Sequence, residues 1–313
     1  MKVVLFCGGM GTRMRSYSES IPKPMVPVGY RPILWHLMKY YAAHGHKDFI
    51  LCLGWQADVI KRYFRDYDET VSNDFVMQPG GEVEVLGGDI HDWKITFVDT
   101  GIRANIGERL MAVRDHLRGE PMFLANYADG LSDADVTAMV AEARATGNVA
   151  TFAGVKPTQS FHVVTDDGSS QVRQIMPVTQ AGLRINGGFF VLRQEIFDYM
   201  EPGEEMVIEP FHRLIREDRL GVYKHDGFWA CMDTFKEKKL LDDLFELGNA
   251  PWTRLWDTAD QRVGQERQAP RDSAGTSRLL PTTPSAQRLE RAPDRAPVRA
   301  RRKQITLRRE TDS

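Results

Sequence analysis

Short apolar runs alternate with segments of helical periodicity through the first half of the chain. Four runs have the length and composition of buried strands, at residues 2–7, 48–54, 95–99 and 122–125. Between them, apolar residues recur at the three- and four-residue spacing of helices, at residues 32–44, 57–67 and 106–116. Strands that alternate with helices indicate βαβ crossovers. The predicted fold class is therefore α/β, with a Rossmann-like, mainly parallel sheet flanked by helices.

The second half has a different pattern. After a helical segment at residues 133–145, strand-like runs occur at residues 149–155, 161–165, 171–176 and 184–192. Turn residues such as Asp166-Asp167-Gly168 separate them, which predicts a smaller antiparallel β layer over the cleft. A last helix is predicted from Thr234, which forms a capping-box pattern with Glu237, to Gly248.

The first apolar run ends in a glycine-rich turn. Gly8, Gly9 and Gly11 would let backbone amides approach a ligand closely, and glycines alone also serve ordinary turns. Arg13 adds a fork of donors for phosphate oxygens, and Lys23, between two prolines, adds a mobile charge. The spacing matches neither the dinucleotide fingerprint nor the P-loop. Together the three glycines and two cations predict a phosphate site for a nucleotide.

Two carboxylates are candidate metal ligands. Asp129 follows the run at 122–125, and the carboxyl ends of parallel strands meet at one ligand-binding edge. Asp233 directly precedes the last predicted helix. Two carboxylates together with phosphate oxygens suit Mg²⁺. Asp before Gly is also a common turn pair, and Asp233 could serve only the positive end of its helix.

Composition leaves room for a full enzyme and indicates an intracellular protein. Its 313 residues, 42% of them hydrophobic, are enough for a large core. The three cysteines lack metal-ligand spacing and are interpreted as reduced thiols. No apolar run reaches the length of a membrane helix, about 18 residues, so we expect a cytoplasmic protein without a membrane partner.

The C-terminal segment differs from the rest. Residues 253–313 carry 14 Arg and Lys against 8 Asp and Glu, five prolines and a single aromatic residue. Such a segment buries too little apolar surface to order itself. We predict a folded domain over residues 1–252 and a basic, disordered tail over 253–313. The basic run at 299–303 leaves weak polyanion binding open, whereas no nucleic-acid-binding signature accompanies it.

Eight motifs occur in an order that resembles a known family. They are Gly8-Gly9-Met10-Gly11-Thr12-Arg13, Pro22-Lys23-Pro24-Met25-Val26, Arg31-Pro32-Ile33-Leu34-Trp35-His36, Val98-Asp99-Thr100-Gly101, Arg109-Leu110, Asp129-Gly130, the segment from Ile185-Asn186-Gly187-Gly188 to Leu192, and Met232-Asp233-Thr234. Over about residues 1–252 the chain resembles the sugar-1-phosphate nucleotidyltransferases, and most of all the glucose-1-phosphate cytidylyltransferases.

The resemblance implies an enzyme that transfers CMP from CTP to a hexose 1-phosphate and releases pyrophosphate, with Mg²⁺ as cofactor and a homo-oligomeric state. It implies nucleotide-binding roles for Gly8, Gly9, Gly11, Thr12, Arg13, Lys23 and Arg109. The catalytic residues would be Arg13, Lys23 and Asp129. The metal ligands would be Asp129 and Asp233. The attacking phosphate oxygen is already ionised, so charge neutralisation and positioning, rather than a histidine base, are the expected means of catalysis.

The acceptor half departs from the family pattern. Ile175 and Met176 stand where the family has a Glu-Lys pair that serves the sugar phosphate. Either Lys156, Arg173 or Arg184 supplies the missing charge, or the acceptor differs from glucose 1-phosphate. The residues predicted to bind the sugar phosphate are Asn186, Gly187, Arg184 and Lys156. Two further alternatives stay open, the same chemistry with dTTP or UTP and a non-catalytic nucleotide-sensing homologue.

Overall fold

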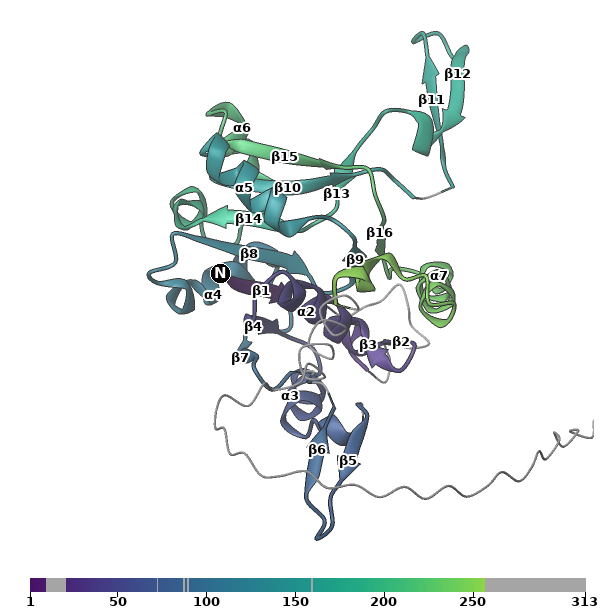
Figure 1. Ribbon diagram of the computed structural model, residues 1–313. Helices are drawn as coiled ribbons and strands as arrows, with labels where there is room; N and C mark the ends of the chain where they lie inside the picture. Colours follow the sequence, from purple (N-terminus) through teal and green to yellow (C-terminus); the bar gives the residue numbers. More distant parts are fainter. Residues whose placement is uncertain (10–20, 72, 87, 89, 159, 257–313) are drawn as a thin grey trace, which may run out of the picture. The chain divides into compact units, whose positions relative to one another are not determined.

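The first apolar run forms the centre of an eight-stranded sheet in the computed structural model, which describes residues 1–9, 21–71, 73–86, 88, 90–158 and 160–256 (Figure 1). The strand order is β13-β10-β14-β8-β1-β4-β7, and β15 pairs with β10. The strands are β1 (Lys2–Phe6), β4 (Asp48–Leu53), β7 (Lys94–Asp99), β8 (Met122–Tyr127), β10 (Ala150–Val155), β13 (Ile185–Asn186), β14 (Phe190–Arg193) and β15 (Leu220–His225).

Most strands of this sheet run in one direction. Strand β1 is parallel to β4 and β8, and β4 is parallel to β7. Strand β14 is antiparallel to both β8 and β10, so β10 has the direction of β8, and β15 is parallel to β10. The carboxyl ends of six strands therefore lie along a single edge. In such sheets that edge binds ligands.

Helices cover both faces of the sheet. A strand such as β1, which is apolar from Val3 to Phe6, requires burial on both sides. Val3 and Leu5 of β1 belong to one hydrophobic cluster, whereas Val4 and Phe6 belong to the other. The first cluster includes residues of α2, α3, α5 and α7, and the second includes residues of α4 and α6. The helices are α2 (Ile33–Ala43), α3 (Ala57–Arg65), α4 (Ile106–Ala112), α5 (Val136–Thr146), α6 (Glu209–Arg216) and α7 (Phe235–Glu246).

The α/β prediction is confirmed, and the elements predicted in the first half exist with small shifts of their ends. The helix predicted at 106–116 stops at Ala112 and continues as the 3-10 turn Arg114–Leu117. The helix predicted from residue 133 begins at Val136 because Asp135 caps it, accepting from the amide of Ala138. The capping box of Thr234 and Glu237 is present.

The predicted antiparallel strands exist, but two of the four segments belong to the central sheet. Segment 149–155 is β10, and segment 184–192 splits into β13 and β14 around Gly187-Gly188. The other two segments, β11 (His162–Asp166) and β12 (Val172–Pro177), pair with each other as an antiparallel hairpin outside the central sheet. Three further two-stranded sheets are β2 (Pro27–Val28) with β3 (Arg31–Pro32), β5 (Phe75–Met77) with β6 (Val83–Val85), and β9 (Gly130–Ser132) with β16 (Trp229–Cys231).

The described chain stays packed beyond the domain boundary predicted after residue 252. Thr253 and Trp256 are buried, and the Trp256 ring contacts those of Trp35 and His36 on α2. The packed unit thus extends at least to Trp256, while the rest of the predicted tail lies outside the described residues. Among the described helices, none is both long and apolar enough to cross a membrane.

Candidate active site

Lys23 joins the two predicted metal ligands. Its ammonium Nζ lies 2.5 Å from Asp129 Oδ2 and 2.5 Å from Asp233 Oδ1. The exposed fractions of the side chains are 16% for Lys23, 27% for Asp129 and 34% for Asp233. Three residues separated by more than 100 positions in the sequence thus meet around one nitrogen atom.

Strand pairing brings the two aspartates together. Strands β9 and β16 pair Gly130 with Cys231, and the amide of Met232 donates to the carbonyl oxygen of Asp129 at 2.8 Å. Asp233 therefore comes next to Asp129 through the register of the ladder. The capping box of α7 fixes its backbone further, since the Asp233 amide donates to Glu237 Oε2 at 2.9 Å.

The local sequence also holds Lys23 in place. It opens the 3-10 turn Lys23–Met25 between Pro22 and Pro24, and the amide of Met25 donates to the carbonyl of Pro22 at 2.8 Å. Burial disfavours the charged form of Lys23, but the attraction of Asp129 and hydrogen bonds to both carboxylates outweigh it and raise the pKa of Lys23. The lysine is therefore an ammonium ion in the neutral pH range.

The glycine-rich turn starts at the carboxyl end of β1. Gly9 has φ +142°, a conformation that favours glycine. Gly8 is needed for a different reason, because a Cβ atom there would lie 2.0 Å from Cζ of Arg109. The other members of the predicted phosphate site, Gly11, Thr12 and Arg13, lie outside the described residues.

Arg109 lies beneath this turn. It is 2% exposed, and its guanidinium donates to the carbonyl of Leu53 at 3.1 Å and to Thr100 Oγ1 at 2.7 Å. Burial lowers the pKa of Arg109. The side chain thus connects the carboxyl ends of β1, β4 and β7, which supports the shape of the turn. Its predicted contact with nucleotide stays a prediction.

The cations proposed for the sugar phosphate are engaged with a carboxylate that the sequence analysis did not single out. Asp226 Oδ1 lies 2.8 Å from a terminal nitrogen of Arg184 and 3.0 Å from Lys156 Nζ. Hydrogen bonds from Lys156 and Arg184 lower the pKa of Asp226. Arg184 also donates to the carbonyls of Gly154 and His225. The third candidate, Arg173, pairs with Asp167 on the β11–β12 hairpin.

The other two predicted sugar-phosphate residues shape the backbone beside the site. Asn186 Oδ1 accepts from the amide of Gly188 at 2.9 Å. Gly187 leaves room for the Val155 side chain, because a Cβ atom at position 187 would lie only 2.7 Å from Cγ1 of Val155. Its carbonyl accepts from the indole of Trp229 at 2.8 Å, and Trp229 belongs to the strand that positions Asp233. The segments predicted for metal and for sugar are therefore joined by one hydrogen bond.

Ile175 and Met176 lie on β12, opposite Val164 and Val163 of β11. The side chain of Ile175 is 64% exposed. An apolar pair on an exposed hairpin offers no donor to a phosphate, so the departure from the family pattern persists in the folded structure.

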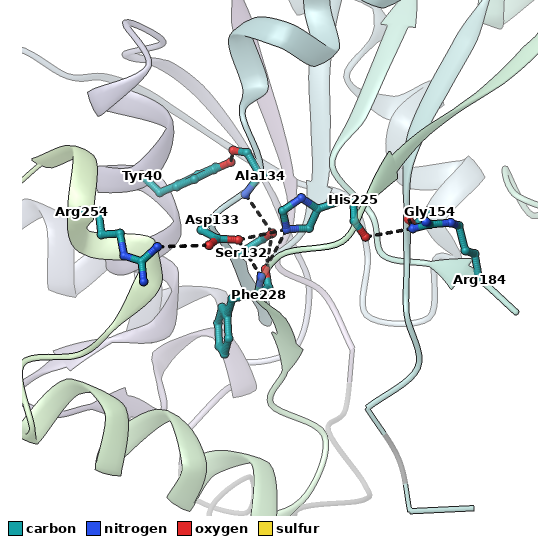
Figure 2. A network of polar contacts seen from close by, with 9 residues as sticks. All are labelled: Tyr40, Ser132, Asp133, Ala134, Gly154, Arg184, His225, Phe228 and Arg254. Atoms are coloured by element: carbon teal, nitrogen blue, oxygen red, sulfur yellow. Dashed lines mark hydrogen bonds and ion pairs between the residues drawn. The ribbon is translucent and has the colours of Figure 1, made fainter. Parts of the chain in front are cut away.

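A serine, a histidine and an aspartate also lie close together at the end of β9 (Figure 2). His225 Nε2 is 3.0 Å from Asp133 Oδ1 and 3.1 Å from the carbonyl of Phe228, and Ser132 Oγ donates to that carbonyl at 2.8 Å. The Ser132 hydroxyl thus bonds to backbone rather than to the imidazole, unlike the nucleophile and base of a hydrolase. The network holds the loop before β16 against β9. The sequence offered only the turn pair Asp226-Gly227 as a signal for it.

The donor set fits a divalent ion that brings further ligands of its own. Two carboxylates from different elements already share one cation, and Mg²⁺ is commonly held by one or two carboxylates together with water and substrate phosphates. Within the described part of the chain, no cluster of three or more His, Cys, Asp or Glu side chains could hold a metal. Asp129 and Asp233 stay the predicted metal ligands.

Comparisons with known proteins identify the family and the fold. Residues 2–240 match the family described as "Nucleotidyl transferase". A glucose-1-phosphate cytidylyltransferase of Salmonella typhimurium is 38% identical over 259 residues, which cover 82% of this chain and 100% of that protein. A mannose-1-phosphate guanyltransferase of Gibberella zeae is 27% identical over 248 residues, 77% of this chain and 62% of that protein. A solved UDP-glucose pyrophosphorylase from Acinetobacter baumanii has a similar fold, with a TM-score of 0.59 at 17% identity over 84% of this chain and 99% of that chain.

Proposed function

The chain belongs to the nucleotidyl transferase family, and we propose that it transfers CMP from CTP to a hexose 1-phosphate, forming a CDP-sugar and pyrophosphate. The observation that carries this proposal is the meeting of Lys23, Asp129 and Asp233 beside the glycine-rich turn. The 38% identity to a glucose-1-phosphate cytidylyltransferase over that protein's full length favours CTP and a glucose-type acceptor. A relative named for guanylyl transfer to mannose 1-phosphate also matches this chain, so the base of the nucleotide and the sugar of the acceptor are tested by experiment.

In the proposed reaction, an oxygen of the acceptor phosphate attacks the α-phosphorus of the nucleotide. A new oxygen–phosphorus bond forms, the bond to the β-phosphate oxygen breaks, and the electron pair leaves with pyrophosphate. Mg²⁺, when bound by Asp129 and Asp233, would neutralise phosphate charge and orient the triphosphate. Lys23 would stabilise the charge that develops during transfer, and Arg13, which lies outside the described residues, would add a second cation.

The nucleotide would lie over Gly8 and Gly9, with Gly11 and Thr12 continuing the cradle. Arg109 supports that cradle from below. For the acceptor, we propose that Lys156 and Arg184 bind the phosphate and that Asn186 and Gly187 border the sugar. The ion pairs with Asp226 are then replaced by pairs with the acceptor phosphate. A homo-oligomer is also proposed, and light scattering of the full chain would test it.

An activity panel tests the function. The purified full chain is incubated with Mg²⁺, one of CTP, dTTP, UTP or GTP, and a set of hexose 1-phosphates, and pyrophosphate is measured. We expect release with CTP above the other triphosphates. If no combination releases pyrophosphate, the proposed catalytic activity is wrong. Nucleotide binding measured by calorimetry would in that case support a nucleotide-sensing protein instead.

Two substitutions test the residues. Lys23→Ala and Asp129→Asn should each lower kcat about 100-fold or more, since one electrostatic contact in such a site contributes about 3 kcal/mol to the transition state. Lys47→Ala is the matched control, because Lys47 pairs with Asp92 at the surface. Activity that survives either site substitution would remove that residue from the mechanism.

A further inference from the structure

Lys23 occupies a place between two carboxylates that a metal ion would also need. Its Nζ contacts one oxygen of Asp129 and one of Asp233, both at 2.5 Å, and its side chain is largely buried. Strand pairing and a helix cap position the two aspartates side by side. The cation that they share in this structure belongs to the protein itself.

Charge makes occupation by Lys23 and by a divalent ion mutually exclusive. The two carboxylates carry two negative charges, which one ammonium ion half neutralises. A divalent ion added beside the ammonium would face a like charge at contact distance in a partly buried site, where charges are weakly screened. The ion can therefore bind well only when the ammonium leaves both carboxylates.

The side chain can leave without rearranging the backbone. Hydrogen bonds from Met25 to Pro22 and from Val26 to Lys23 fix the main chain of this turn, whereas the four-carbon stem of lysine is flexible. An incoming triphosphate supplies a new anionic partner for the ammonium.

We propose that Lys23 is an internal substitute for the divalent ion, and that nucleotide and metal together displace it from Asp129 and Asp233. This inference rests on the proposed function, which supplies the triphosphate and the ion. In the free protein the lysine half neutralises the two partly buried carboxylates and weakens binding of the ion alone. In the complex it transfers to the phosphates, so one residue prevents unproductive metal binding and later serves the reaction.

Binding of Mn²⁺ without nucleotide tests the exchange. The free ion is followed by electron paramagnetic resonance while it is titrated into the wild-type chain and into Lys23→Met, which removes the charge and keeps the length. We expect Lys23→Met to bind Mn²⁺ at least about tenfold more tightly, because a neighbouring charge shifts an ionic equilibrium by about one to three powers of ten. Adding Asp129→Asn to Lys23→Met should abolish the gain.

A matched control separates local from global charge effects. Lys238→Met removes a lysine that pairs with Asp242 on α7, so the net charge changes equally, and Mn²⁺ binding should stay at the wild-type level. Lys23→Arg keeps the charge and should also show no gain. Equal Mn²⁺ affinity of wild type and Lys23→Met, or an equal gain in Lys238→Met, would overturn the proposal.

Lys23→Met could be less stable than the wild type, because Asp129 and Asp233 lose the ammonium between them. Thermal unfolding measures metal binding in that case as well. Mn²⁺ should raise the Tm of Lys23→Met by several degrees more than that of the wild type, as a ligand that binds only the folded state does. An equal shift in both proteins would contradict the exchange. Neither measurement uses substrate, so an inactive protein that shows the exchange would reject the proposed function alone.

Discussion

Replacing Gly8 by alanine should disturb the glycine-rich turn through Arg109. The added Cβ would lie 2.0 Å from Cζ and 2.1 and 2.3 Å from the two terminal nitrogens of that guanidinium. Ordinary contacts between such atoms need about 3.5 Å, so the guanidinium must move by more than an ångström. It would then lose its bonds to the Leu53 carbonyl and to Thr100 Oγ1.

The expected cost follows from those two bonds. Each is a hydrogen bond from a charged donor in a buried setting, and such a bond contributes about 1.5–3 kcal/mol. Gly8→Ala should therefore lower the free energy of unfolding by about 3–6 kcal/mol. Urea unfolding, compared at equal m-value, measures this loss. CTP affinity should fall in parallel, because the turn that would hold the phosphates is displaced.

A double-mutant cycle isolates the cause. In an Arg109→Ala background the obstacle is gone, so adding Gly8→Ala should cost about 1 kcal/mol or less, and the coupling should equal most of the single-mutant effect. Gly130→Ala is the control, since a Cβ there meets nothing closer than 3.8 Å. If the two substitutions prove additive, or if Gly8→Ala is as mild as Gly130→Ala, the close approach of Arg109 does not explain the glycine.

Two further outcomes follow from other groups. Burial lowers the pKa of His36 from 6.5 to about 4. Between pH 6.5 and 4 the imidazole is therefore protonated in the unfolded chain and neutral in the folded chain. The free energy of unfolding should therefore fall by about 3 kcal/mol as the pH falls from 7 to 4, and His36→Gln should remove that part of the slope in urea titrations. Asp226→Asn should lower KM for the hexose 1-phosphate several-fold at unchanged kcat, because Lys156 and Arg184 lose their competing anion. A pH slope that His36→Gln leaves unchanged, or a KM that does not fall, would contradict the respective argument.

The sequence predicts the sheet well where burial alone decides the structure. Val3 to Phe6 are apolar on both faces because helices cover both faces, so periodicity alone identifies β1 as a buried strand. The last helix was predictable because its cap is local, with Thr234 and Glu237 three residues apart. Asp129 could be placed at the carboxyl edge of the sheet because parallel strands end at one edge.

Elements that depend on distant partners were not predictable from local patterns. The segment 184–192 has the composition of one strand, yet it breaks at Gly187-Gly188, where Gly188 has φ +77° and Phe189 has φ +51°. The break is held by Asn126, whose Oδ1 accepts from the Phe189 amide at 2.9 Å. Only the fold brings β8 to that point. Strand β15 was missed as well, because its sequence Leu-Gly-Val-Tyr-Lys-His does not alternate apolar with polar residues, although its burial alternates from Gly221 to His225.

The roles of single polar residues depend even more on tertiary contacts. Arg109 matches a nucleotide-associated arginine by position in the sequence, and the fold buries its guanidinium beneath the turn. Asp226 had no signal beyond a turn pair, although it contacts both cations that the sequence suggested for the acceptor phosphate. A charge can be predicted from sequence more readily than the partner that neutralises it.

Two charge clusters of opposite composition lie along the ligand-binding edge. At the carboxyl end of β8, one ammonium lies between Asp129 and Asp233, whereas beyond β10 and β15 one carboxylate, Asp226, lies between Lys156 and Arg184. The first cluster has a net negative charge and suits an added cation, and the second has a net positive charge and suits an added phosphate. Unpaired charges are costly in the first cluster, where the side chains are partly buried, so Lys23 serves there as the counter-ion. In the second cluster Lys156 and Asp226 are mostly exposed, so their ion pair contributes little to stability. Ligand binding at this edge would then exchange ion pairs rather than create them, which keeps the free protein stable and makes affinity depend on how well the incoming ion replaces the internal one.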